Sequence, residues 1–280
     1  MNSSRNLISF PDINEAIEDA SSVNEICQNY IDMLNSTGNI GHNVYANKLL
    51  EYLEIDQKIY LFEDEFHQFK KYLRKWSKAN NVKIFIKCRK KSFIGLNEKI
   101  RLFYPNPDRI NDLIGFRLVL QTFETDSFES IKLCYKLLND IIQYFVVDKK
   151  YSLLETTTLI DVGTTSIPGL VIPSGKSLIL EGFENKIQDY IRHPKKDTGY
   201  QSLHCCIRTP LGLIFEVQVR TFAMDIRNDH RSYKQHRYSN SHIDLDYSKI
   251  SLPGIAFDEK NQIIFDNSGL LKGYNPFNNS

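Results

Sequence analysis

The chain has 280 residues, of which 41% are hydrophobic and 25% are charged, and its formal net charge is +1. This length is enough to bury the core of one large domain or of two modest ones. A net charge so close to zero excludes capture of a polyanion by a global electrostatic field, so an anionic partner would have to meet local basic clusters.

The five cysteines are odd in number and lack any Cys-x-x-Cys spacing, which argues against a disulfide framework and against a zinc site. They favour a reducing, cytoplasmic setting. Residues 1–20 contain no continuous apolar segment of the kind found in a signal peptide. The chain also has no run of about 18 apolar residues, so neither a spanning helix nor a membrane partner is expected.

The N-terminal region, residues 1–80, is predicted to be helical. Apolar residues at helical spacing predict one helix over 11–34 and a longer one over 43–78, with a glycine-containing loop at 35–41 between them. The longer helix carries a stripe of aromatic residues. We interpret this stripe as core, although it could also be a surface that binds a partner.

The middle of the chain alternates between strand and helix patterns. Alternating apolar residues predict a strand over 82–87, followed by a turn and a short helix over 89–100. Residues 112–120 form a mostly apolar run of buried-strand length, and 125–145 place apolar residues on one helix face. This order predicts a layered domain of the α/β or α+β class.

The C-terminal half begins with a patchwork of polar and apolar residues over 149–184, interpreted as an insertion of short strands and loops. Two strand patterns over 202–208 and 213–220 are separated by a short hairpin signal. A helix is predicted over 221–237. The serine-, asparagine- and glycine-containing segment 239–280 is predicted to be a docking tail or to be partly disordered.

A basic cluster ends the first predicted strand. Arg89, Lys91 and Ser92 lie there, and Lys99 lies on the following helix. Fixed cations beside a helix N-terminus could hold a triphosphate, although such a cluster can also be a solvated surface. Asp112, at the start of the next buried strand, could be a magnesium ligand or a plain turn residue.

A second polar cluster lies on the last predicted strand. Glu216, Gln218 and Arg220 alternate with valines and therefore share one face. Such a row is suited to metal binding, proton transfer and phosphate binding, and its simpler interpretation is a solvent-facing strand surface.

A third cluster precedes the hairpin and contains Lys195, Lys196, Gly199, Tyr200 and His204. The glycine lets the backbone turn, and the tyrosine ring could stack on a nucleobase beside the two lysines. The alternative for the lone histidine is a structural role in the core.

Taken in this order, the three clusters resemble the synthetase domain of the RelA/SpoT family, the alarmone synthetases. The resemblance covers about residues 80–238. The positions that match the family's motifs are Arg89, Lys91, Ser92 and Lys99, then Asp112, Leu113, Gly115 and Arg117, then Asp189, Tyr190, Ile191, Pro194, Lys195, Gly199, Tyr200, Ser202, Leu203 and His204, then Glu216, Gln218, Arg220 and Thr221, and finally His230, Tyr233 and Lys234.

The resemblance implies an α+β fold with a mixed β-sheet flanked by helices, in a nucleotidyltransferase-like synthetase domain. This domain would span 81–238, with the insertion at about 149–184, after the helical region 1–80 and before the tail 239–280. It also implies transfer of the β,γ-pyrophosphate of ATP to a ribose 3′-hydroxyl with Mg²⁺ as cofactor. Such a reaction needs an aligned acceptor and fixed positive charge.

The resemblance also implies roles for single residues. Arg89, Lys91, Ser92 and Lys99 would bind ATP. The catalytic residues would be Asp112, Glu216 and Gln218. Asp112 and Glu216 would bind the metal, or Glu216 would instead take the 3′-OH proton. Gln218 would orient nearby groups. The acceptor-binding residues would be Tyr200, stacked on the acceptor base, and Lys195, Lys196, His204 and Arg220.

The sequence departs from the family pattern mainly on the acceptor side. Thr198 replaces the usual asparagine before Gly-Tyr, Gly95 stands where a second serine is common, and 149–184 is long for a compact synthetase. The N-terminal helices carry no His-Asp pair, so a metal-dependent hydrolase domain is not expected. These departures leave the acceptor open.

Three functions are compatible with these residues. The preferred prediction is a toxic small alarmone synthetase of a toxin–antitoxin pair, which pyrophosphorylates the tRNA 3′ CCA end, inhibits translation and has an antitoxin protein as partner. Its RNA-binding residues would be Lys195, Lys196, Arg192, Arg231 and Arg237. The first alternative is a GTP or GDP pyrophosphokinase that makes (p)ppGpp. The second is a non-catalytic nucleotide- or RNA-binding module, against which the retained Asp112 and Glu216 argue.

Overall fold

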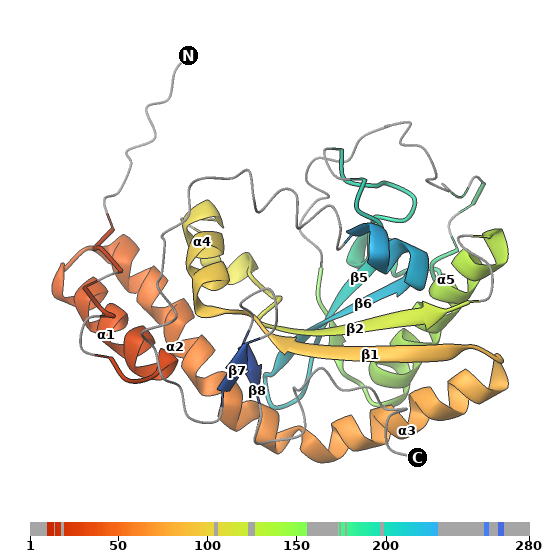
Figure 1. Ribbon diagram of the computed structural model, residues 1–280, viewed down its shortest axis with the longest axis horizontal. Helices are drawn as coiled ribbons and strands as arrows, with labels where there is room; N and C mark the ends of the chain where they lie inside the picture. Colours follow the sequence, from red (N-terminus) through yellow and green to blue (C-terminus); the bar gives the residue numbers. More distant parts are fainter. Residues whose placement is uncertain are drawn as a thin grey trace.

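The computed structural model of the chain describes a sheet, the helices that cover it and a group of N-terminal helices (Figure 1). The residues described are 10–13, 15–17, 20–103, 106–122, 127–155, 173, 175–176, 178–196, 199–228, 255–257 and 263–265. Within these residues, no helix is both long enough and apolar enough to cross a membrane.

Three helices precede the sheet: α1 (Val23–Ser36), α2 (Ile40–Leu61) and α3 (Glu63–Ala79). The prediction that the first helix starts at residue 11 is wrong. The helix starts at Val23 because the Ser22 hydroxyl accepts a hydrogen bond from the Glu25 amide and caps it.

The prediction of one helix over 43–78 is also wrong, because the chain breaks between α2 and α3 at Phe62. The Phe62 side chain is buried, with its ring centroid 5.4 Å from that of Phe215 in the sheet. Long-range packing at this residue therefore interrupts a pattern that is locally continuous. The aromatic stripe itself is core as predicted, since Phe66, Phe69 and Trp76 are buried.

The main sheet is mixed. Its strands are β1 (Lys83–Lys90), β2 (Ile114–Gln121), β3 (Ser152–Leu153), β4 (Gln188–Asp189), β5 (Leu203–Arg208) and β6 (Ile214–Thr221), in the order β1-β2-β6-β5-β3, with β4 paired to β5. β2 and β6 are parallel, and the other pairs are antiparallel. This sheet and its helices confirm the predicted α+β class.

The remaining helices follow the predicted order. They are α4 (Phe93–Phe103), the 3₁₀ helices η1 (Pro107–Arg109) and η3 (Glu184–Lys186), α5 (Phe128–Ile142), and the π-helix η2 (Gln143–Asp148) that continues α5. The predicted hairpin is confirmed, because β5 and β6 pair in antiparallel register across a turn in which Gly212 has φ +80°.

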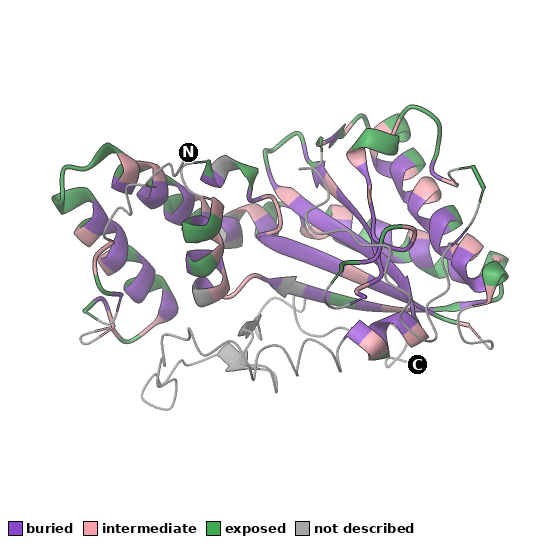
Figure 2. Cartoon of the chain, turned by 90° about the horizontal axis from the view of Figure 1, so that it is seen from above, coloured by how far each residue is buried: buried purple, intermediate pink, exposed green. Residues whose placement is uncertain are grey.

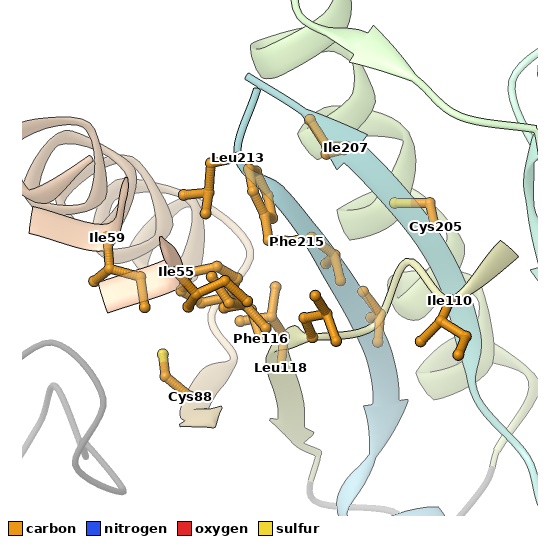
Figure 3. Close-up of a cluster of buried hydrophobic side chains, with 14 of the residues drawn as sticks. Ile55, Ile59, Cys88, Ile110, Phe116, Leu118, Cys205, Ile207, Leu213 and Phe215 are labelled. Atoms are coloured by element: carbon orange, nitrogen blue, oxygen red, sulfur yellow. The ribbon is translucent and has the colours of Figure 1, made fainter. Parts of the chain in front are cut away.

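The two faces of the sheet differ in chemistry. One face carries Phe116, Leu118 and Phe215, and it meets the aromatic side chains of α3 and η2, with Phe66 5.4 Å from Phe116 and Phe145 5.4 Å from Phe215. Figure 3 shows these sheet residues in one apolar cluster with residues of α2 and β5. Figure 2 shows the strands buried along most of their length. The residues of opposite parity make the other, polar face.

Parts of the predicted organisation fall outside the described residues. In the insertion these are 156–172, 174 and 177. Of the predicted helix over 221–237, Thr221 instead ends β6, 222–228 are helical, and 229–237 lie outside the described residues. In the tail, β7 (Ile255–Phe257) and β8 (Ile263–Phe265) form an antiparallel pair. The division into three regions at 80 and 238 stays a prediction.

Candidate active site

The polar face of the sheet brings together residues from four strands. The register places Lys87 opposite Arg117, Arg117 opposite Gln218, and Gln218 opposite His204. Side chains paired across neighbouring strands point to the same face. Glu216 and Arg220 lie on that face as well, two residues to either side of Gln218.

Asp112 lies at the start of β2, between two lysines. Its Oδ2 is 2.9 Å from Lys91 Nζ and 2.7 Å from Lys99 Nζ. Lys91 continues the edge of β1, where its amide donates to the Leu113 carbonyl at 2.7 Å. Lys99 comes from α4. The sheet edge and the helix therefore converge on one carboxylate.

Ser92 starts α4. Its Oγ accepts a hydrogen bond from the Gly95 amide at 3.1 Å, so it satisfies a free N–H of the first helical turn. A Cβ atom on Gly95 would lie 3.0 Å from that same Oγ. The glycine found in place of the family's second serine therefore leaves room for this cap.

The electrostatics of Asp112 favour the ionised form. Burial and the charge of Glu216 both raise its pKa, but Lys91 and Lys99 outweigh them and hold the pKa below the ordinary value. Its Oδ1 is buried and accepts no hydrogen bond from any residue the structure describes. A buried carboxylate oxygen without a donor is a place for a ligand.

Glu216, Gln218 and Arg220 form a hydrogen-bonded row. Gln218 Nε2 donates to Glu216 Oε2 at 2.6 Å, and Arg220 Nη2 donates to Gln218 Oε1 at 2.6 Å. The three residues are 7%, 6% and 1% exposed, which excludes the simpler interpretation of a solvated strand surface. Burial raises the pKa of Glu216, but the contacts from His204 and Gln218 lower it to well below the ordinary value.

His204 joins Glu216 to Tyr200. Its Nδ1 is 2.9 Å from Glu216 Oε1, and its Nε2 is 2.8 Å from the Tyr200 hydroxyl. Burial lowers the pKa of His204 despite the neighbouring carboxylate. Lys195 Nζ and the Arg220 guanidinium lie 5.2 and 5.3 Å from the centre of the Tyr200 ring. Tyr200 itself is half-buried, and these two cations lie beside its ring.

The two halves of the candidate site are electrostatically connected. Glu216 raises the pKa of Asp112, and Lys99 lowers the pKa of both carboxylates. Lys196 is exposed at the end of the described loop. Three groups of candidate residues lie outside what the structure describes: the side chain of Arg89, the whole of Thr198, and the segment with His230, Arg231, Tyr233, Lys234 and Arg237.

Sequence reasoning missed Asp225, which follows β6 on the helical segment 222–228. Its carboxylate lies 3.0 Å from Lys87 Nζ and 3.5 Å from both Arg117 Nη1 and Arg220 Nη1. Cations from three adjacent strands therefore share one buried carboxylate. The arginine at 117, inside a mostly apolar strand, was the available signal that such a partner exists.

A second missed contact explains Asp189, a motif residue to which no role was given. Both of its carboxylate oxygens accept from the Tyr135 hydroxyl at 2.9 Å, and Oδ1 also accepts from the Arg192 amide at 2.9 Å. Asp189 thus ties the loop that carries Lys195 to helix α5. Its role is to hold that loop in place.

Residues 177–243 match the family model described as "Region found in RelA / SpoT proteins". Over this segment the chain is similar to RelA/SpoT proteins, which confirms the predicted resemblance there. The matched segment includes Tyr200, His204, Glu216 and Gln218. The toxic subtype stays a prediction.

The curated proteins to which the chain is similar are much longer. It is 27% identical over 169 residues to a probable guanosine-3′,5′-bis(diphosphate) 3′-pyrophosphohydrolase of Mycoplasma genitalium, across 60% of this chain and 17% of that protein. It is 28% identical over 184 residues to a protein of that name in Spiroplasma citri, across 65% of this chain and 18% of the relative. The chain therefore spans less than a fifth of the length of these relatives.

Among solved structures, the chain is similar to small alarmone synthetase 1 from Bacillus subtilis bound to its product pppGpp. The match covers 64% of this chain and 80% of that one, with 18% sequence identity and a TM-score of 0.37.

Proposed function

We propose that the chain is an ATP-dependent pyrophosphokinase that transfers the β,γ-pyrophosphate of ATP to the ribose 3′-hydroxyl of GTP or GDP, making the alarmone (p)ppGpp. The observation that carries the proposal is Asp112, held between Lys91 and Lys99 beside the buried Glu216. Glu216 belongs to the segment that matches the RelA/SpoT model.

In this reaction the 3′-oxygen of the acceptor forms a bond to the β-phosphorus of ATP. The bond from that phosphorus to the oxygen shared with the α-phosphate breaks, AMP leaves, and the 3′-OH proton is released. Lys91 and Lys99 place two positive charges beside Asp112, where they could contact the migrating phosphates. Arg89 is proposed as a further ATP ligand, and Ser92 acts by capping the helix that carries Lys99.

The carboxylates fit the implied Mg²⁺. Mg²⁺ prefers oxygen ligands and is usually held by one or two carboxylates together with substrate phosphates and water. Asp112 offers a buried oxygen without a donor, and Glu216 lies close enough to affect its pKa. Bound Mg²⁺ would neutralise charge on the transferred phosphates.

Glu216 is better suited to orienting the acceptor hydroxyl and the metal than to acting as a strong base. Its two oxygens already accept hydrogen bonds from His204 and Gln218, and such bonds stabilise the ionised carboxylate and weaken it as a proton acceptor. Its fixed negative charge can still accept a hydrogen bond from the 3′-OH. Tyr200 is proposed to stack on the acceptor base, with Lys195 and Lys196 near the acceptor phosphates.

The names of the relatives support a guanine nucleotide as the acceptor. Both are named for guanosine-3′,5′-bis(diphosphate), which is a guanosine with a pyrophosphate on its 3′-oxygen. This favours the (p)ppGpp alternative over the tRNA prediction. The tRNA 3′ end and an antitoxin stay predictions, and two arginines expected to grip RNA, Arg231 and Arg237, lie beyond the described residues.

Incubation with γ-labelled ATP and Mg²⁺ tests the proposal, with GTP, GDP and deacylated tRNA as separate acceptors. Label in the guanine nucleotide together with release of AMP is expected. Label found only in tRNA would show that tRNA, and not a guanine nucleotide, is the acceptor. Absence of label from all three acceptors would contradict the proposed pyrophosphate transfer. Release of pyrophosphate from added guanosine-3′,5′-bis(diphosphate), without transfer, would show a hydrolase. A Glu129→Gln variant, changed at an exposed position on α5, is the control and is expected to stay active.

A further inference from the structure

His204 occupies a position that the acceptor-binding prediction does not explain. It is 7% exposed, and both of its ring nitrogens already have partners in the protein. A side chain that receives an acceptor phosphate would need a ring nitrogen facing the substrate. Here the ring is used to connect two other residues of the candidate site.

The chemistry of the partners determines the direction of each hydrogen bond. The Glu216 carboxylate can only accept, so His204 Nδ1 carries a proton and donates it across 2.9 Å. In a neutral imidazole the other nitrogen is then an acceptor. The Tyr200 hydroxyl therefore donates to Nε2 across 2.8 Å.

These bonds belong to a closed arrangement of five side chains. Tyr200 donates to His204, His204 to Glu216, Gln218 to Glu216, and Arg220 to Gln218. The Arg220 guanidinium then lies 5.3 Å from the centre of the Tyr200 ring. His204 on β5 and Gln218 on β6 thus each donate to one oxygen of Glu216, so the carboxylate cannot rotate without losing a hydrogen bond.

We propose that His204 is a positioning residue, which couples the acceptor-stacking Tyr200 to Glu216 and fixes the orientation of that carboxylate. This inference rests on the proposed function and changes the role of one residue within it. The Tyr200 ring contacts the acceptor, while its hydroxyl acts through His204. Contact of the acceptor with the Tyr200 ring and the orientation of Glu216 are then linked through one side chain.

The variants that test this role differ in where they place a donor. His204→Asn keeps an N–H near the Nδ1 position, whereas His204→Gln places its amide near Nε2. His204→Ala and His204→Gln are expected to lose roughly 10- to 100-fold in kcat with little change in acceptor KM, and His204→Asn to restore most of that kcat. A rise in acceptor KM in all three variants, with kcat retained, would show phosphate binding and overturn the proposal.

Two variants of Tyr200 separate the role of its ring from the role of its hydroxyl. Tyr200→Phe keeps the stacking surface and is expected to lower kcat roughly tenfold at unchanged acceptor KM, whereas Tyr200→Ala should raise acceptor KM. Equal effects of the two variants on KM would contradict the coupling. Urea unfolding of each variant shows whether a lost kcat reflects a lost fold.

A measurement without turnover separates this inference from the proposed function. In ¹⁵N NMR of the wild-type chain, His204 is expected to be protonated at Nδ1 and unprotonated at Nε2, with its signals assigned by their loss in His204→Asn. Protonation at Nε2 instead would overturn the proposal. If wild type transfers no pyrophosphate but shows this tautomer, the proposed function fails while the link between Tyr200 and Glu216 stands.

Discussion

The two faces of the same strands show how differently neighbouring residues contribute. On β6, Phe215 and Val217 lie in the apolar cluster, and Glu216 and Gln218 lie on the opposite face in a network of hydrogen bonds. Apolar burial stabilises the fold wherever it occurs. Buried charges are expensive unless they are paired, and on the polar face Asp225 pairs with Lys87, Arg117 and Arg220. The pyrophosphate transfer is expected to take place on the polar face.

Phe215→Ala tests the apolar face. Phe215 is fully buried and contacts three aromatic rings, of Phe62, Phe116 and Phe145. Its truncation is expected to cost about 3–5 kcal/mol of unfolding free energy, measured by urea denaturation. Activity per folded molecule should stay unchanged. A large loss of kcat at full folding would show that the two faces are not separable.

Glu216→Gln, the neighbouring residue, should show the reverse behaviour. The shape is kept and the charge is lost, so kcat for pyrophosphate transfer is expected to fall about 100- to 1,000-fold. The urea midpoint should change far less than in Phe215→Ala. Asp112→Asn should behave in the same way, whereas Glu129→Gln on the exposed surface of α5 should leave the rate unchanged.

Acidification should weaken the polar face selectively. The folded-state pKa of Asp112 is lowered, so its ion pairs stabilise the fold above the unfolded-state value and are lost as the pH falls through the folded-state value. The stability difference between wild type and Asp112→Asn should therefore shrink as the pH is lowered below about 4. A difference that stays constant in urea titrations at neutral and acidic pH would contradict the assignment.

Ser92→Ala should have the smallest effect. Loss of the cap on α4 is expected to cost about 0.5–2 kcal/mol of stability, and the KM for ATP should rise because α4 carries Lys99. Ser127→Ala is a matched control, since Ser127 caps α5 in the same way. It should lose similar stability without any change in ATP KM. Equal shifts of KM in both variants would show a general effect of destabilisation.

Several features of the fold and the site could be predicted from local patterns. Period-two alternation placed Glu216, Gln218 and Arg220 on one face, and the β5–β6 hairpin followed from two strand patterns around a turn. The break at Phe62 could not be predicted, because it depends on contact with a strand far away in the sequence. Neither could Asp225, whose partners come from three strands.

The residue types and their spacing were enough to predict the family resemblance, the α+β class and the shared face of Glu216, Gln218 and Arg220. The shared face follows from the two-residue period of a strand. Burial of these three residues, the convergence of Lys91 and Lys99 on Asp112, and the contact of His204 with Glu216 appear only in the folded chain. The reason is physical: these contacts depend on strand register and helix packing between distant segments, which no local pattern encodes.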